Sequence, residues 1–365
     1  MEELFNKCNI CPRECNVNRN KGEIGYCGAS NKIKIGGYHL HMWEEPIITG
    51  KNGSGTIFFS YCNLRCIYCM DEKNNKFLKN DEKLTDDEIY KVIKESANLG
   101  IKKVRITGGE PLVRQGIVKL ISKINTIPGI EEIYLTTNGI LLADMIDELA
   151  VNGLKGVNIS LDSLKEERFN KLTRLGKLDK VLKAIDKAID LGIKVKLNTV
   201  IVNDINKDEI LDFVKLTIEK PIDVRFIELM PIGIAVNYKG VTNQEVLKVI
   251  SKIYPDYEEV VRSKSGGPAS YIKVKGGKGK IGFISAMSNC FCEECNRVRL
   301  TPEGFLKQCL HFDYGVDLKS KLRENISDEE LNKLIFDNIY DKPEKHLFLE
   351  KSDHKELKFM NQIGG

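Results

Sequence analysis

Three groups of cysteines are the residues of this chain whose spacing best suits chemistry. One group, Cys62, Cys66 and Cys69, stands in the segment FFSYCNLRCIYCM with the spacing C-x3-C-x2-C. Structural zinc usually takes four protein ligands, whereas iron–sulfur clusters accept thiolates this close together. Three thiolates leave one iron of a four-iron cluster open, and a substrate can chelate that iron. The group therefore predicts a catalytic [4Fe-4S] cluster, with scattered core cysteines as the structural alternative.

A second group near the end of the chain has the same incomplete set of ligands. Cys292, Cys295 and Cys309 follow the pattern C-x2-C-x13-C, and Arg297 and Arg299 stand among them. We expect a second [4Fe-4S] cluster with one open iron and two cations beside it. The alternative is a structural zinc ribbon that takes its fourth thiolate from Cys290.

The remaining group lies at the start of the chain and has four members. Cys8, Cys11, Cys15 and Cys27 follow the pattern C-x2-C-x3-C-x11-C. Four thiolates suit a third metal site, either an iron–sulfur cluster or zinc. Spare cysteines without a metal fit the sequence equally well, so both interpretations stay open.

Composition narrows the class of protein. The chain has 365 residues, a formal net charge of +4, 42% hydrophobic and 30% charged residues, and acidic and basic residues are interleaved. We therefore expect neither a nucleic-acid partner nor a membrane, while an anionic small molecule remains compatible. The first residues lack the pattern of a secretory signal. Eleven cysteines, an odd number, favour metal ligands over disulfides in a reducing cytoplasm.

The elements that must position these residues alternate between strand and helix. Short β-rich runs occur at Thr56–Ser60, Lys103–Thr107, Ile133–Thr137, Gly156–Leu161, Lys194–Val202 and Ile222–Glu228. Strand–helix units in series predict a parallel sheet that right-handed crossovers can curl. The expected fold class is α/β: an open (βα)6 partial TIM barrel over 51–235. A Cys-rich extension at 1–50 precedes it, and a C-terminal auxiliary-cluster domain at 236–365 follows it.

The predicted strands carry polar residues on one face. In the second strand, Val104 and Ile106 suit contact with helices, so the residues between them face the other way. The inward polar set comprises Lys103, Arg105, Thr107, Asn158, Ser160, Asp162, Lys196, Asn198, Asp223 and Arg225. Burying such a set without partners is costly, so the interior should hold water or an anionic ligand. The alternative is that these charges reach the barrel mouth and are solvated.

The first cysteine group resembles the cluster motif of the radical S-adenosylmethionine (SAM) superfamily. Its pattern C-x3-C-x-Y-C follows the first strand, and TGGEP at Thr107–Pro111 is similar to the superfamily's motif for the SAM amino group. Two glycines let the backbone approach a ligand closely, and Glu110 can accept a hydrogen bond from an ammonium.

Longer segments resemble the GTP 3′,8-cyclase family of molybdenum cofactor biosynthesis. The segments VRITGGEPLVR, LTTNG, VNISLDSL, VRFIELMPIG, GKIGFIS, KPEKH and the terminal IGG occur in the family's order over roughly residues 62–365. The resemblance implies that SAM cleavage yields a 5′-deoxyadenosyl radical, which removes a hydrogen atom from ribose C3′ of GTP. The sugar radical then attacks guanine C8, and the second cluster binds the guanine base.

The same resemblance implies roles for particular residues and partners. Contacts with SAM fall to Tyr68, Gly109, Ser160 and Met230. Contacts with GTP fall to Lys103, Arg105, Thr136, Lys196, Arg297 and Arg299. The expected partners are an electron donor of the flavodoxin or ferredoxin type and a cyclic pyranopterin synthase that acts on the product; a homodimer stays open. The terminal Gly364–Gly365 resembles the family's mobile tail, with a disordered end as the alternative.

The first sixty residues depart from that family. Gly55 stands where the family has an arginine that binds GTP, and Lys51 is a weak substitute. Instead, CNICPREC, GYC and the segment leading to Cys62 resemble radical SAM proteins related to the pyruvate formate-lyase activating enzymes. Two rival functions therefore remain: another radical SAM enzyme, such as a glycyl-radical activator or a peptide-modifying enzyme, and a metal-binding protein without catalysis.

Overall fold

A computed structural model describes most of the chain. The described residues are 5–29, 35–41, 54–59, 61–69, 86–98, 101–260, 269–288, 299–300, 305–309, 312, 315–324 and 326–341.

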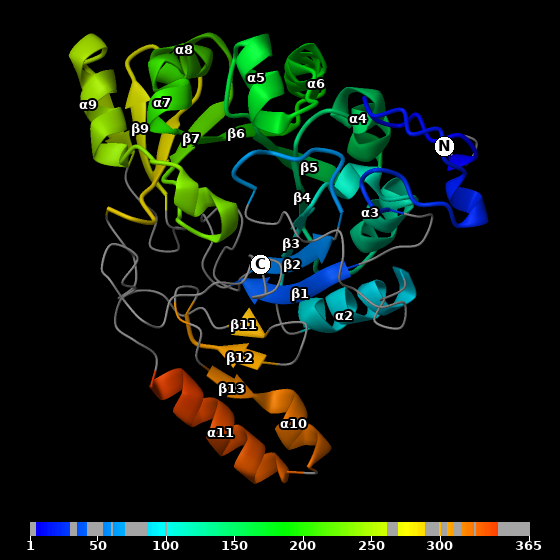
Figure 1. Cartoon of the computed structure of the whole chain (residues 1–365). Helices are drawn as coiled ribbons and strands as arrows, with labels where there is room; N and C mark the ends of the chain where they lie inside the picture. The colour runs from blue at the N-terminus through cyan, green and yellow to red at the C-terminus, as the bar shows by residue number, and fades with distance from the viewer. Residues whose placement is uncertain are drawn as a thin grey trace.

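A curved sheet forms the centre of the molecule (Figure 1). Its strands lie in the order β1-β2-β3-β4-β5-β6-β7-β10-β9-β8, and the run from β2 to β7 is parallel throughout. The parallel strands are β2 (Ser54–Phe59), β3 (Lys103–Gly108), β4 (Glu132–Thr137), β5 (Leu154–Ser160), β6 (Lys194–Val200) and β7 (Asp223–Ile227). All of them overlap the strands predicted from the sequence, which confirms the α/β partial-barrel prediction.

Further strands extend the sheet at both ends. β1 (Ile35–His41) pairs antiparallel with β2. At the other end, β10 (Ile281–Ile284) pairs parallel with β7, and β9 (Ser270–Val274) and β8 (Tyr257–Val260) follow antiparallel. The sheet therefore continues past residue 235, and in the described part of the chain it begins at β1 and ends at β8 without closing.

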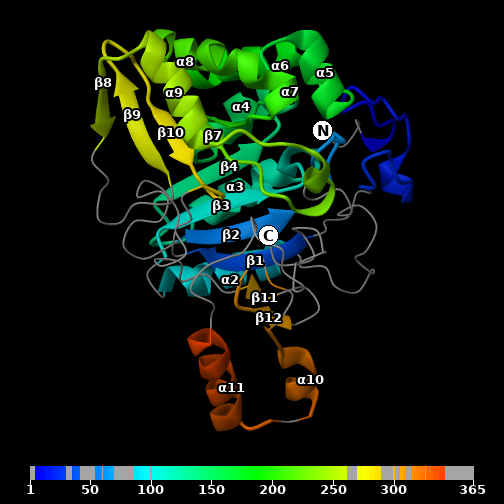
Figure 2. The same ribbon diagram turned by 60° about the vertical axis from the view of Figure 1, so that its left-hand side comes forward.

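Helices cover the outer, convex face of the sheet (Figures 1 and 2). The helices are α2 (Asp86–Asn98), α3 (Ile117–Asn125), α4 (Leu142–Val151), α5 (Glu166–Thr173), α6 (Leu178–Asp190), α7 (Asn203–Asn206), α8 (Ile210–Glu219) and α9 (Asn243–Ile253). Short 3-10 turns are η2 (Arg19–Lys21), η4 (Pro111–Val113), η5 (Lys207–Glu209) and η6 (Gly233–Asn237). In α6 the buried residues Leu178, Val181 and Ile185 recur at helical spacing, so one stripe packs on the sheet.

The alternation of side chains across the strands separates core from interior. Val104, Ile106, Val157, Leu197 and Phe226 point to the helices and are buried in one continuous hydrophobic cluster. Because side chains alternate along a strand, their polar neighbours face the inside of the curve. Burial of the apolar residues against the helices thus fixes the alternate, polar residues on the inner face of the sheet.

The C-terminal part contains a small separate sheet. β11 (Arg299–Leu300), β12 (Phe305–Lys307) and β13 (Gly315–Asp317) are antiparallel and are followed by α10 (Leu318–Arg323) and α11 (Asp328–Tyr340). Both views place this unit on the β1 side of the large sheet (Figures 1 and 2). Of the helices in the described ranges, none has the length and apolar character needed to cross a bilayer.

Candidate active site

The first cysteine group lies on a loop that leaves the carboxyl end of β2. Cys62, Cys66 and Cys69 are half-buried free thiols, and the backbone N–H of Leu64 donates to Cys62 Sγ over 3.4 Å. Burial raises the pKa of the Cys62 and Cys66 thiols, and the neighbouring thiols of the group raise it further. Because the thiolate is the form that binds metal, these sulfurs need a nearby positive charge such as cluster iron.

The number and spacing of these cysteines suit a cluster, because three thiolates are one fewer than structural zinc usually takes. Within the described ranges, no group of three His, Cys, Asp or Glu side chains is placed to hold one metal ion. A four-iron cluster binds each thiolate at a different corner of a cube, so it takes its ligands further apart than one ion does. Three cysteines on one loop can ligate three of the irons, and the fourth iron is left without a cysteine from this loop.

Two glycines at the end of β3 fasten this strand to the cluster loop. Gly109 N donates to Phe59 O over 2.8 Å, and Glu110 N donates to Tyr61 O over 2.7 Å. A Cβ on Gly109 would lie 2.1 Å from Tyr61 O, and one on Gly108 would lie 2.1 Å from Phe59 O. Only glycine allows this approach, so Gly108 and Gly109 determine where the cysteine loop begins.

Glu110 connects the ends of β3 and β4 through hydrogen bonds. It is 1% exposed and accepts hydrogen bonds from Leu112 N at 3.0 Å, Thr137 Oγ1 at 2.8 Å and Asn138 N at 2.7 Å. Burial raises its pKa to about 7, although these donors oppose the shift. The expected role of Glu110 as an acceptor for the SAM ammonium stays a prediction, and the structure adds these three hydrogen bonds within the protein. Asn138 Nδ2 in turn donates to Asn63 Oδ1 over 2.8 Å, beside Cys62.

The end of β5 faces the same region. Ser160, the last residue of β5, is exposed, whereas Asp162 Oδ1 accepts from Val200 N over 2.7 Å. Burial raises the pKa of Asp162 to about 6, and the Tyr68 hydroxyl beside it lowers it. The Tyr68 ring meets the Tyr238 ring edge-on with 5.9 Å between centroids. Tyr68 therefore packs the cysteine loop against the segment that follows η6.

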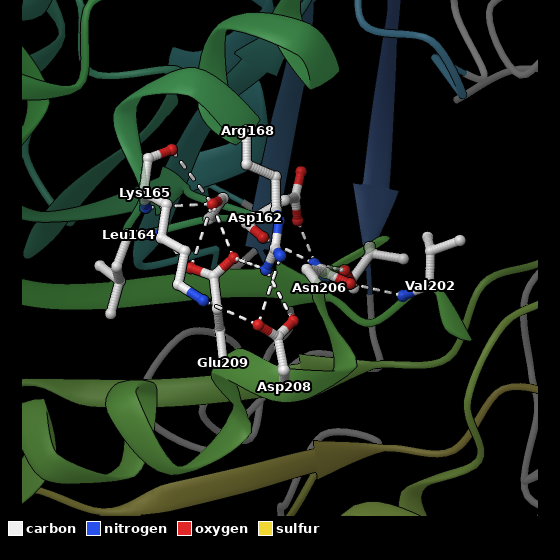
Figure 3. Close-up of polar contacts among 10 residues, drawn as sticks. Asp162, Leu164, Lys165, Arg168, Val202, Asn206, Asp208 and Glu209 are labelled. Atoms are coloured by element: carbon white, nitrogen blue, oxygen red, sulfur yellow. Dashed lines mark hydrogen bonds and ion pairs between the residues drawn. The ribbon is translucent and has the colours of Figure 1, made fainter. Parts of the chain in front are cut away.

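A buried polar network holds the segment that follows β5 (Figure 3). Asn206 Nδ2 donates to Asp162 O over 2.6 Å, and Asn206 Oδ1 accepts from Val202 N over 2.7 Å. Glu209 accepts from Leu164 N over 2.6 Å and forms an ion pair with Arg168. These contacts tie the β5 end to α7 and η5, so they set the position of Ser160.

Cations line the inner face of the sheet. Lys103 Nζ lies 2.8 Å from Glu132 Oε2, and Arg105 Nε donates to Thr136 Oγ1 over 3.3 Å. Asn158 Nδ2 shares that hydroxyl at 3.5 Å. The structure thus brings together Lys103, Arg105 and Thr136, as the sequence predicts.

Two further interior cations lie on β6 and β7. Lys196 is 6% exposed, with Nζ 6.0 Å from the centre of the Tyr271 ring. Arg225 is 3% exposed and donates from Nε to Asn198 Oδ1 over 2.8 Å. Arg225 was absent from the predicted GTP contacts, although its alternation with Val224 and Phe226 already placed it on the inner face. Buried cations of this kind suit a polyanionic ligand.

Other predicted residues are placed in part. Met230 is half-buried just after β7, Cys309 is a half-buried free thiol after β12, and the backbone of Arg299 begins β11. Gly55 lies in β2 opposite Val104 of β3. Outside the described residues lie Lys51, Cys290, Cys292, Cys295, Arg297 and Gly364–Gly365.

Comparisons with known proteins agree with this geometry. Residues 56–217 match the family model of the Radical SAM superfamily. A solved structure of SuiB from Streptococcus suis bound to S-adenosylmethionine superimposes with a TM-score of 0.53 and 14% identity, covering 74% of this chain and 64% of SuiB. That likeness concerns the fold alone. The parallel sheet and the cysteine loop thus define a radical SAM enzyme.

The second half of the chain narrows the class further. Residues 222–348 match the family Molybdenum Cofactor Synthesis C. A GTP 3′,8-cyclase of Clostridium perfringens (strain 13 / Type A) is 60% identical over 304 residues, which cover 83% of this chain and 94% of that relative. One of Clostridium botulinum (strain Hall / ATCC 3502 / NCTC 13319 / Type A) is 47% identical over 308 residues, with the same coverage. The chain belongs to the GTP 3′,8-cyclase family.

Proposed function

We propose that this protein converts GTP to (8S)-3′,8-cyclo-7,8-dihydroguanosine 5′-triphosphate, the first step of molybdenum cofactor biosynthesis, with SAM as cosubstrate. Membership of the family supports the reaction. The observation that carries it is a set of cations on the inner face of the sheet that also carries the cysteine loop: Lys103 and Arg105 are half-buried, and Lys196 and Arg225 are buried. A triphosphate is an anion that such a set can bind through charge-assisted hydrogen bonds.

The carboxyl ends of β2, β3 and β5, with the segment after β7, form the SAM side of the site. Cys62, Cys66 and Cys69 would hold a [4Fe-4S] cluster, which when bound supplies the electron that splits SAM. Contacts with SAM fall to Tyr68, Gly109, Ser160 and Met230. Of these, Gly109 contributes backbone because it has no room for a side chain, and Ser160 contributes an exposed hydroxyl.

The interior cations form the GTP side. They bind the triphosphate, which keeps ribose C3′ within reach of the SAM side, and Thr136 orients Arg105 through its hydroxyl. The proposed contacts with GTP are Lys103, Arg105, Thr136, Lys196, Arg297 and Arg299, to which we add Arg225. Cys292, Cys295 and Cys309 would hold a second [4Fe-4S] cluster that binds the guanine base through its open iron.

The partners and the compartment follow from this chemistry. A donor of the flavodoxin or ferredoxin type would supply electrons, and a cyclic pyranopterin synthase would consume the product. Reduced thiols suit the cytoplasm. The division at residues 50 and 235 and the homodimer stay predictions.

The activity is tested by incubating anaerobically reconstituted protein with SAM and dithionite. Three reactions are compared: one with GTP, one with ATP and one without nucleotide. We expect a cyclised nucleotide together with 5′-deoxyadenosine only in the reaction that contains GTP. Deoxyadenosine formed while GTP stays intact would favour a glycyl-radical activator or a peptide-modifying enzyme. Neither product from fully reconstituted protein would favour a metal-binding protein without catalysis.

Two matched variants separate the roles of the two cysteine groups. Cys62→Ala should abolish SAM cleavage under every condition, because the first cluster loses a ligand. Cys309→Ala should retain slow SAM cleavage without nucleotide but form no cyclised product. Chromatography of both products measures this, and loss of SAM cleavage in folded Cys309→Ala would contradict the assignment.

A further inference from the structure

The N-terminal module, residues 5–29, lies outside both family matches, which begin at residue 56. Apart from η2, the module consists of turns and loops that are joined by backbone hydrogen bonds. Cys8 N donates to Val17 O at 2.9 Å, and Asn16 N donates to Cys8 O at 2.8 Å. A segment this short cannot bury enough apolar surface to order itself, so such segments are usually stapled by disulfides or metal.

The core of this module consists largely of thiols. Cys8, Cys11 and Cys27 are buried, Cys15 is half-buried, and all four are free. Tyr26 N donates to Cys15 Sγ over 3.3 Å. A Cβ on Gly25 would lie 3.5 Å from Cys15 Sγ and 3.6 Å from Arg19 Nη2. The sulfurs of Cys15 and Cys27 therefore both lie near Arg19, in a module where Cys8 and Cys11 are also buried.

A buried arginine stands among these thiols. Arg19 is 1% exposed, and its Nη2 donates to Cys27 Sγ over 3.2 Å. Its Nε and Nη1 have no hydrogen-bond partner, and among the described residues it forms no ion pair with a carboxylate. The ring of Phe5 lies 5.3 Å from its guanidinium carbon. Burying an unpaired guanidinium costs free energy. Because arginine stays protonated, the site requires negative charge beside it.

We propose that Cys8, Cys11, Cys15 and Cys27 bind a [4Fe-4S] cluster and that Arg19 is its buried counter-cation. Four thiolates give such a cluster net negative charge, which offsets the guanidinium. Spare cysteines leave Arg19 unexplained. Zinc is disfavoured because three close cysteines with a distant fourth are typical of iron–sulfur sites.

The module packs on the loop of the first cysteine group. Cys27, Ala29 and Tyr61 form one hydrophobic cluster, and Tyr61 directly precedes Cys62. Arg65 donates from Nη2 to Tyr26 O and from Nη1 to Cys62 O, each over 3.0 Å. A cluster in the module would therefore lie next to the catalytic loop, with all four irons ligated by the protein and none open to substrate.

Metal analysis of the full-length protein tests the site. We compare iron, zinc and acid-labile sulfide in reconstituted wild type and in Cys8→Ala/Cys15→Ala, and expect the variant to lose about four irons and about four sulfides per chain. A variant that retains all its iron while staying folded, or a loss of zinc instead, would overturn the proposal. If the variant does not fold, Mössbauer spectroscopy of wild type decides: a cluster with four thiolate-ligated irons that SAM and GTP leave unperturbed supports it, and its absence refutes it.

The counter-cation is tested by the reduction potential of that cluster, read by electron paramagnetic resonance. Arg19→Met should shift the potential to more negative values, because the reduced cluster gains charge without a cation beside it. Arg19→Lys keeps a positive charge at this position, so its cluster should have a reduction potential close to that of the wild type. Equal potentials in wild type and Arg19→Met would remove Arg19 from the proposal.

Discussion

At the scale of single residues, buried cations and close backbone approaches determine the site. Lys196 and Arg225 lie inside the sheet where water is scarce, so each keeps its charge only with polar or anionic company. Gly109 acts differently: because it has no side chain, its backbone can lie against the Tyr61 carbonyl. Both kinds of residue yield direct tests.

Lys196→Met should weaken GTP binding by about 1.5–3 kcal/mol, the usual value of a hydrogen bond to a charged group, while SAM binding is unchanged. Calorimetry on reconstituted protein measures both. Lys155→Met is the matched control, because Lys155 lies exposed near the start of β5 and loses the same charge. Equal losses in the two variants would mean that only net charge matters.

Gly109→Ala should destabilise the fold by about 1–3 kcal/mol through contact with the Tyr61 carbonyl, and should lower iron content at the first cluster. Gly116 has a φ of +75° but open space around its Cα, so Gly116→Ala tests backbone strain alone. We expect Gly116→Ala to keep full iron content. Urea unfolding and iron assays check both, and normal cluster loading in Gly109→Ala would be inconsistent with its fastening role.

At the scale of elements, the ends of β5 and β6 are held by carboxylates of contrasting burial. Glu209 is fully buried, whereas Asp208, which pairs with Lys165 and Arg168, is largely exposed. Arg168 and Lys165 lower the pKa of Asp208 to about 2, so it is ionised at neutral pH. Solvent screening nevertheless limits what the exposed pair contributes.

Glu209→Gln should reduce stability by about 1–3 kcal/mol and raise the KM for SAM. The substitution replaces one of the two oxygens that accept from Leu164 N and Ser163 by an NH2 donor and removes the charge paired with Arg168, so the β5 end shifts. Asp208→Asn should cost less than about 1 kcal/mol and leave that KM unchanged. Urea unfolding with steady-state kinetics compares them, and similar effects in the two variants would argue against a positioning role for the network.

The sequence predicts the parallel strands and their polar faces because alternation is a local pattern. It therefore places Lys103, Arg105, Lys196 and even Arg225 inside. It does not reveal that β1 and β10 extend the sheet, since such pairing depends on partners distant in the chain. The role of Glu110 in connecting strand ends was missed for the same reason: its donors Thr137 and Asn138 lie on another strand.

At the scale of the whole molecule, Arg65 joins two units. It stacks near the Tyr26 ring at 5.1 Å, bonds Tyr26 O, and bonds Cys62 O. The N-terminal module and the catalytic loop are therefore expected to open together.

Arg65→Ala should speed amide hydrogen exchange both in residues 5–29 and in residues 61–69, because each loses contacts that hold it to the other. Lys183→Ala, an exposed change on α6, is the control and should alter neither segment. Faster exchange in only one of the two segments would show that the module and the loop are independent.

The most direct measurement uses GTP carrying deuterium at ribose C3′. If the interior cations hold the triphosphate so that C3′ faces the cleaved SAM, the deuterium must appear in 5′-deoxyadenosine as the cyclised nucleotide forms. Mass spectrometry of both products under anaerobic turnover shows this. Deoxyadenosine without deuterium, formed while GTP remains intact, would contradict the assignment of this site to GTP.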